Sequence, residues 1–140
     1  MIGIDTNMLV RYIAQDDAVQ SVQASALIEQ QCSAEAPGFV GVVVLVELVW
    51  VSESCYGATR AEVADIVRRI LSIRQLAVQE AELVWKALRL FEVGKADFSD
   101  CVIKGAADTA GCTVIMTFDR RAAATAGMTL LNGRGPSEPG

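Results

Sequence analysis

Four acidic residues stand in apolar surroundings, where a carboxylate calls for a chemical explanation. Glu47 is the only charged residue in the run 39–51. The other three are Asp5 after Met-Ile-Gly-Ile, Asp119 after Val-Ile-Met-Thr-Phe, and Asp100 within Ala-Asp-Phe-Ser-Asp-Cys-Val-Ile. Because an unpaired ionised carboxylate is costly to remove from water, such a group is normally neutralised by protonation, a cationic partner or a metal ion. If these acids converge, a divalent metal ion is the natural partner for them.

The metal ion that such a cluster favours is Mg²⁺ or Mn²⁺. Carboxylate oxygens suit these hard cations, and crowded carboxylates raise one another's pKa unless a dication compensates. The sequence contains no histidine, which excludes serine-histidine and cysteine-histidine nucleophilic sites and most zinc or iron sites. The chemistry that suits such a metal site is phosphodiester hydrolysis, in which the ion lowers the pKa of a bound water and stabilises charge on the phosphate.

Each acid also has a purely structural explanation. Asp5, Asp97 and Asp119 precede predicted helices and could cap them, while Asp100 lies in the favourable first turn of its helix. Glu47 could face solvent or pair with an arginine from another helix. Caps are common, so the structural explanation is favoured for any one acid alone. The four together, with Glu47 inside its apolar run, favour a metal site.

Polar and basic residues near the acids could complete such a site. Those that could orient the carboxylates or metal-bound water are Thr6, Asn7, Asp97 and Thr117. Turn and capping chemistry explains them equally well. Those that could form a phosphate-binding rim are Arg11, Lys104, Arg120 and Arg121. Lys104 lies one helical turn after Asp100, however, and could instead pair with it or with Asp108.

Composition and charge limit the classes of protein. A chain of 140 residues fits one domain with a substantial core. A net charge of -5 argues against a globally basic nucleic-acid-binding protein but leaves room for a local basic rim around an acidic pocket. The 4 cysteines are widely spaced without a CxxC motif, which favours buried free thiols over a zinc site or a disulfide framework.

The N-terminal segment and the apolar runs predict a soluble cytoplasmic protein without membrane contact. Asp5 and Asp17 fall where a signal peptide would need an apolar core. Glu47 interrupts the longest apolar run, which is in any case too short to span a bilayer. We expect one domain over residues 1–131 and a disordered Gly/Pro/Ser tail over 132–140.

The predicted elements alternate between short apolar strands and helices. The strands are expected at 2–4, 39–42, 75–79, 113–118 and 128–131. The helices are expected around 8–13, 18–31, 45–50, 59–73, 80–93, 97–110 and 120–126. This alternation predicts an α/β fold with a central, mainly parallel sheet flanked by helices. Because sites form outside the carboxyl ends of parallel strands, Asp5 and Asp119 should meet at one edge.

Four segments of the chain resemble PIN-domain proteins. They are MIGIDTNMLVRY at the start, then VELVW, then ADFSDCVI and finally TFDR. They follow one another in the order of that family between residues 2 and 131, and more specifically they resemble the VapC-type toxins of bacterial toxin-antitoxin pairs. The resemblance implies a PIN-like fold in which Asp97 matches a further acid of the motif. It also implies that the metal-binding acids are Asp5, Glu47, Asp100 and Asp119.

The resemblance carries implications for activity and partners as well. It implies an endoribonuclease that depends on Mg²⁺ or Mn²⁺ and acts on transfer RNA or another structured RNA. It further implies a homodimer and a cognate VapB-like antitoxin that covers the site and brings a DNA-binding domain. The alternative from another class is a catalytically silent PIN-like module that binds RNA or protein. A haloacid-dehalogenase-type phosphatase is disfavoured because it needs an acid where Asn7 stands, and a phosphorelay receiver because no acidic pair follows the first strand.

Overall fold

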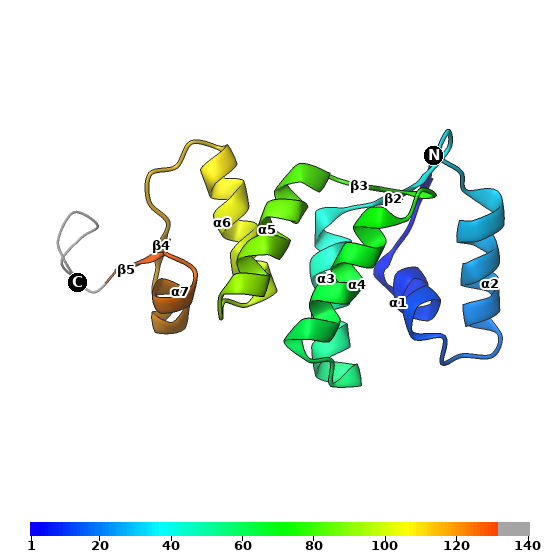
Figure 1. Ribbon diagram of the computed structural model, residues 1–140, viewed down its shortest axis with the longest axis horizontal. Helices are drawn as coiled ribbons and strands as arrows, with labels where there is room; N and C mark the ends of the chain where they lie inside the picture. Colours follow the sequence, from blue (N-terminus) through cyan, green and yellow to red (C-terminus); the bar gives the residue numbers. More distant parts are fainter. Residues whose placement is uncertain (132–140) are drawn as a thin grey trace. The chain divides into compact units, whose positions relative to one another are not determined.

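The computed structural model describes residues 1–131 as short parallel strands separated by helices (Figure 1). The chain divides into two compact units, the first formed by Met1–Ala81 and the second beginning at Glu82. The predicted disordered tail, 132–140, lies outside the described residues. Strands and helices alternate along the chain as the sequence predicts, and the α/β fold class is confirmed.

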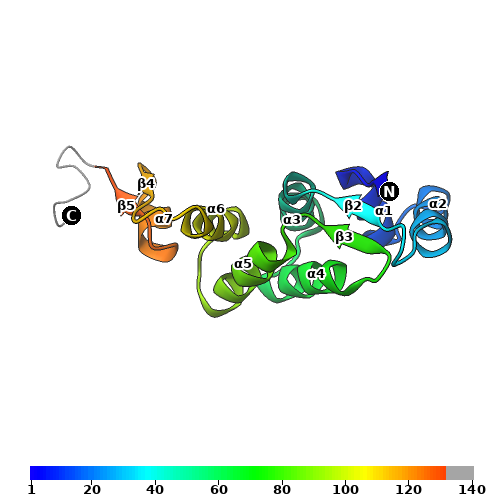
Figure 2. The ribbon, with the colours of Figure 1, turned by 90° about the horizontal axis from the view of Figure 1, so that it is seen from above.

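The first unit is built on a three-stranded parallel sheet with the order β1-β2-β3 (Figure 2). Its strands are β1 (Ile2–Gly3), β2 (Gly38–Val40) and β3 (Leu76–Val78). The register sets Gly3 opposite Phe39, and Phe39 opposite Ala77. Since β1 and β2 run in the same direction, the segments that follow them leave the sheet at the same edge. The chain continues from that edge into two helices, one of which starts directly after Asp5.

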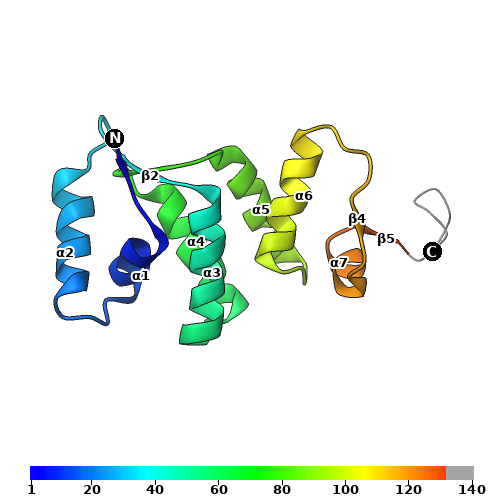
Figure 3. The same cartoon turned by 180° about the vertical axis from the view of Figure 1, so that it is seen from behind.

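Helices cover this sheet and bury most of the first unit's core (Figure 3). They are α1 (Thr6–Ala14), α2 (Gln20–Ala26) with its π-helical extension η1 (Leu27–Gln31), α3 (Val42–Tyr56) and α4 (Arg60–Ser72). Helix α1 packs against both α2 and α3. In α4 the buried residues Val63, Val67 and Ile70 recur at helical spacing, which gives this helix one core-facing stripe.

The apolar run 39–51 divides into strand β2 and the first part of α3. Helix α3 buries only some of its apolar side chains. Leu45 and Leu48 are fully buried, whereas the side chains of Val43 and Trp50 are 72% and 65% exposed. Glu47 is also exposed. The expectation that Glu47 is desolvated is therefore wrong, because α3 turns this carboxylate away from the core. No helix within residues 1–131 has the length and apolar character needed to cross a membrane.

The second unit contains α5 (Ala81–Val93), α6 (Phe98–Thr109) and α7 (Arg120–Thr125) with a two-stranded parallel sheet. The strands are β4 (Met116–Thr117) and β5 (Thr129–Leu130). Phe91 and Phe98 meet edge to face, with ring centroids 5.7 Å apart, and both are nearly fully buried. This aromatic pair joins the end of α5 to the start of α6 and lies just before the acidic segment of α6.

The described strands form two parallel sheets, one in each unit, where the sequence predicts a single central sheet. Every strand pairing within residues 1–131 is parallel, as expected. The strands are shorter than predicted: β4 covers only Met116–Thr117 of the expected 113–118. Its partner β5 is equally short, and a strand extends only as far as it finds backbone partners.

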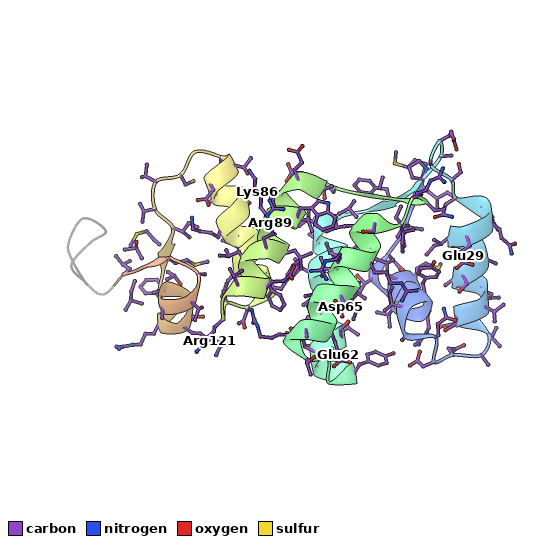
Figure 4. The ribbon with its side chains drawn as sticks, viewed as in Figure 1. Glu29, Glu62, Asp65, Lys86, Arg89 and Arg121 are labelled. Atoms are coloured by element: carbon purple, nitrogen blue, oxygen red, sulfur yellow. The ribbon has the colours of Figure 1, made fainter. Side chains whose placement is uncertain are left out.

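Substitution of Thr59 tests the capping box that starts α4. The Thr59 hydroxyl accepts a bond from the backbone N–H of Glu62, labelled in Figure 4, and the Glu62 carboxylate accepts one from the N–H of Thr59. Thr59→Ala removes the first bond and is expected to lower the free energy of unfolding by about 1 kcal/mol. Thermal melts followed by circular dichroism measure the loss. Thr59→Ser keeps the cap and should melt near the wild type, so equal destabilisation of both variants would contradict this role.

Candidate functional site

The first part of the candidate site joins the start of α1 to the middle of α3. Asp5 follows β1 and is the N-cap of α1, with its Oδ1 accepting a hydrogen bond of 2.9 Å from the backbone N–H of Met8. The next residue, Thr6, donates its hydroxyl to Oε1 of Glu47 at 2.9 Å. These partners are 41 residues apart in the sequence. The contact places the Glu47 carboxylate at the N-terminal end of α1, where Asp5 also lies.

Asp5 and Glu47 both keep one carboxylate oxygen free. Within residues 1–131 the second oxygen of each side chain accepts no hydrogen bond, and neither carboxylate is paired with a cation. Both residues are exposed. Of the structural explanations for Glu47, the solvent-facing one therefore applies and the pairing with an arginine does not. The pair offers oxygen donors that are accessible and not neutralised by the protein.

The second part of the candidate site lies in the second unit, at the N-termini of α6 and α7. Asp119 caps α7, and its Oδ1 accepts bonds from the backbone N–H groups of Arg121 at 2.8 Å and Ala122 at 3.3 Å. The Thr117 hydroxyl accepts a bond of 3.0 Å from the N–H of Asp119. Asp97 occupies the N-cap position of α6 but makes no capping bond with its side chain. The predicted capping role is thus confirmed for Asp119 and is wrong for the Asp97 side chain.

Asp100 is the most electrostatically perturbed acid of this part. Burial raises the pKa of its carboxyl above the ordinary value, and the negative charges of Asp97 and Asp119 raise that pKa further. Arg121 opposes the shift. The three acids therefore lie close enough within the second unit to repel one another. A bound dication is one way to relieve such repulsion.

The basic residues predicted to bind phosphate have different surroundings. Arg121, labelled in Figure 4, lies 3.6 Å from Asp97 and donates to the backbone carbonyl of Lys95. Lys104 pairs with Asp108 at 2.7 Å, so the second of its predicted pairings applies. Arg120 is exposed and has no hydrogen bond or ion pair within residues 1–131.

Arg11, the fourth predicted phosphate-binding residue, is held in the first unit. Its Nη1 lies 3.5 Å from Asp16, and its Nε donates to Gln20 at 2.8 Å. The sequence does not anticipate the surroundings of Arg11, which include the Tyr56 hydroxyl bonded to Asp16 at 2.8 Å. Asp16 and Tyr56 are 40 residues apart, and no local pattern signals a contact over that separation.

The structure groups the predicted acids by unit, Asp5 and Glu47 in the first, Asp100 and Asp119 in the second. No group of three or more His, Cys, Asp or Glu side chains suited to a metal ion is found within residues 1–131. The convergence of all four acids stays a prediction. The donor chemistry nevertheless fits a hard dication, because the candidate ligands offer only oxygen atoms.

The cysteines do not alter this assignment of ligands. All four are free thiols, and Cys32 and Cys101 are buried as expected. Cys55 and Cys112 are exposed, so the prediction of burial is wrong for these two. Both lie on segments that face solvent, Cys55 near the end of α3 and Cys112 in the loop before β4. The thiols therefore indicate neither a disulfide framework nor a zinc site within the described residues.

The fold and the polar residues describe an α/β protein with parallel strands and acids at helix N-termini. Comparison with known protein families shows that residues 2–128 match the PIN domain. The chain belongs to the PIN domain family. It is also similar to a VapC ribonuclease of Aquifex aeolicus (strain VF5), with 24% identity over 119 residues. That similarity covers 84% of this chain and 87% of the relative.

Proposed function

We propose that the chain is a metal-dependent endoribonuclease and the toxin of a toxin-antitoxin pair. Its membership of the PIN domain family and its similarity to a VapC ribonuclease support this proposal. The structural observation that carries it is the hydrogen bond from Thr6 to Glu47, which brings two acids from distant segments to one end of α1. A carboxylate pair that is exposed and lacks a cationic partner is suited to hold a metal ion at the protein surface.

The residues that would hold Mg²⁺ or Mn²⁺ are Asp5, Glu47, Asp100 and Asp119. When bound, the ion would supply an activated water and stabilise negative charge on the phosphate. Thr6 fixes Glu47 through its hydroxyl, while backbone N–H groups fix one oxygen of Asp119. These bonds hold the carboxylates in place before any substrate arrives, which lowers the reorganisation that binding requires.

The proposal includes one PIN domain over residues 1–131, acting in the cytoplasm on RNA, with transfer RNA among the candidate targets. It also includes a homodimer and a cognate VapB-like antitoxin. Val43 and Trp50 expose apolar surface on α3, at 72% and 65% of their accessible area. Exposed apolar side chains on one element are typical of protein interfaces, so α3 is the candidate surface for association.

Removal of metal tests the proposed chemistry. Cleavage of a panel of labelled RNAs, including transfer RNAs, should be lost in excess EDTA because the carboxylates cannot activate water without the ion. Addition of Mg²⁺ or Mn²⁺ in excess over the chelator should restore it. The measurement is the rate of product formation on a denaturing gel.

Two results would overturn this proposal. Cleavage that continues unchanged in EDTA would exclude a metal-dependent mechanism. Binding of RNA without cleavage under every metal condition would instead support the catalytically silent module. Circular dichroism of the same samples confirms that the chelator leaves the fold intact, so that loss of activity reports on the metal.

A further inference from the structure

A shallow cavity of about 610 Å³, open to solvent, lies beside the Thr6 and Glu47 contact in the first unit. It is formed by α1, the loop that follows it and the C-terminal half of α3. Its lining residues are Thr6, Asn7, Val10, Arg11, Asp16, Val51, Cys55 and Tyr56. Because Thr6 belongs both to this lining and to the hydrogen bond with Glu47, the cavity begins at the proposed site.

One wall of the cavity is formed by the Tyr56 ring and the Arg11 guanidinium, and Asp16 contacts both of them. Asp16 accepts the Tyr56 hydroxyl at 2.8 Å and lies 3.5 Å from the Arg11 guanidinium. Gln20 holds the Nε of Arg11 from the other side at 2.8 Å. Tyr56 is nevertheless 46% exposed, so its ring is accessible while its hydroxyl end is anchored. A ring held in this way loses little entropy when a planar group stacks on it.

Asn7 supplies a free hydrogen-bonding group to the same cavity. It is exposed, and its side-chain amide makes no hydrogen bond within residues 1–131. Asn7 and Arg11 are separated by four residues on α1 and therefore lie on one face of that helix. Both also line an adjacent cavity of about 240 Å³, which includes Asp5. These two side chains thus border both the cavity that contains Tyr56 and the one that contains Asp5.

The charges of the cavity favour recognition of a base over attraction of phosphate. Arg11 is the only cation in its lining, and Asp16 is paired with it. An electrostatic groove for a nucleic-acid backbone would need unpaired lysine or arginine side chains. An aromatic ring beside an amide with both a donor and an acceptor matches the way proteins hold single unpaired bases.

We propose that this cavity is a subsite for one unpaired nucleotide of the RNA substrate, next to the bond that is cleaved. The base stacks on Tyr56, and the Asn7 amide bonds to the edge of the base. Arg11, held by Asp16 and Gln20, forms the wall of the subsite beside the ring. The choice of RNA as ligand rests on the proposed nuclease function. The subsite then limits cleavage to RNA whose nucleotide at this position is free of base pairing.

Abasic substitution tests the subsite directly. A short single-stranded RNA is prepared with one abasic position at a time, and both binding and cleavage are measured. Binding is followed by fluorescence anisotropy in EDTA, so that it does not depend on turnover. Loss of the base at a single position beside the cleaved bond should weaken binding by about 5-fold to 150-fold, the usual range for base stacking on an aromatic side chain.

Variants of Tyr56 test whether loss of stacking on its ring causes the weaker binding of the abasic RNA. Tyr56→Leu should bind the unmodified RNA more weakly than the wild type does, and should lose most of the sensitivity to the abasic position, with only the share from Asn7 left. Tyr56→Phe keeps the ring and should keep that sensitivity. Phe39→Leu is a matched control, because Phe39 is 38% exposed and lies outside the cavity lining. This control should behave as the wild type.

The outcomes separate the subsite from the proposed nuclease function. Cleavage without any position-specific effect of the missing base would overturn the subsite alone. An unchanged abasic effect in Tyr56→Leu would also overturn it. Base-dependent binding without cleavage in any metal would support the subsite and contradict the nuclease proposal, while absence of both binding and cleavage would overturn both.

Discussion

RNA cleavage by the Asp100→Asn protein is expected to fall at least about 100-fold below that of the wild type, with the fold retained. A neutral amide is a poorer ligand for a hard cation than a carboxylate, and loss even of the groups that support metal ligands typically reduces function by about 10-fold to 100-fold. Asp100 makes no hydrogen bond within residues 1–131 that the change would break. Its neutralisation also relieves repulsion from Asp97 and Asp119. Cleavage rates and growth arrest on expression measure the effect.

Asp65→Asn provides the matched control for this charge change. Asp65 lies on α4 and pairs with Arg68 at 3.1 Å, with 79% of its side chain exposed (Figure 4). Exposed ion pairs contribute little to stability, and Asp65 lies outside the candidate site. The control should cleave RNA and arrest growth as the wild type does. A folded Asp100→Asn protein that remains fully active would remove the proposed metal role of Asp100.

Phe98→Ala is expected to destabilise the protein by about 3–5 kcal/mol, which is a large part of the stability of a small domain. The Phe98 side chain is 2% exposed and packs edge to face against Phe91 at a centroid distance of 5.7 Å. The substitution removes this contact and leaves a cavity that the rigid surroundings fill only in part. Urea unfolding followed by circular dichroism measures the free energy of unfolding.

Phe118→Ala is the control for Phe98, because it deletes the same side chain from a position that is 80% exposed. Surface substitutions of this kind usually change stability by less than about 0.5 kcal/mol. Similar unfolding midpoints for the two variants would show that the Phe91 and Phe98 pair does not stabilise the second unit. The readout is stability alone, since both phenylalanines adjoin acids of the candidate site.

The boundaries of helices that begin at a capping residue were the most predictable part of the fold, whereas α3 extends over Val42–Tyr56, well beyond the predicted 45–50. The capping box and the helical spacing of apolar residues predict a helix over 59–73, and α4 covers Arg60–Ser72. Likewise the predicted helix over 97–110 is observed as Phe98–Thr109. Strand lengths were predicted less well, because an apolar run marks where a strand can form while its partners decide how far it pairs. Sequence also could not show that the strands occur as two parallel sheets.

The residues of the candidate site stay a prediction, while the structure shows the environment of each residue, which the sequence does not reveal. The run around Glu47 is apolar on all sides of the helix, so its periodicity does not reveal which face α3 buries. The structure exposes Glu47 and fixes it through Thr6, a contact between residues 41 positions apart. A capping role is also compatible with the proposed metal role, because Asp5 and Asp119 cap their helices with one oxygen and the other accepts no hydrogen bond within residues 1–131.

The proposed use of Asp5 and Asp119 both as helix caps and as metal ligands has a genetic consequence. Each cap needs only one side-chain oxygen, and asparagine is as good a helix cap as aspartate. Aspartate and asparagine codons differ by a single base, so one transition converts either residue into a neutral cap. Such an allele would encode a folded chain with its surfaces unchanged but without the charge that a metal ion requires. Under the proposed toxin function, a single base change in either codon would give an inactive allele whose product still folds and is not removed as a misfolded protein.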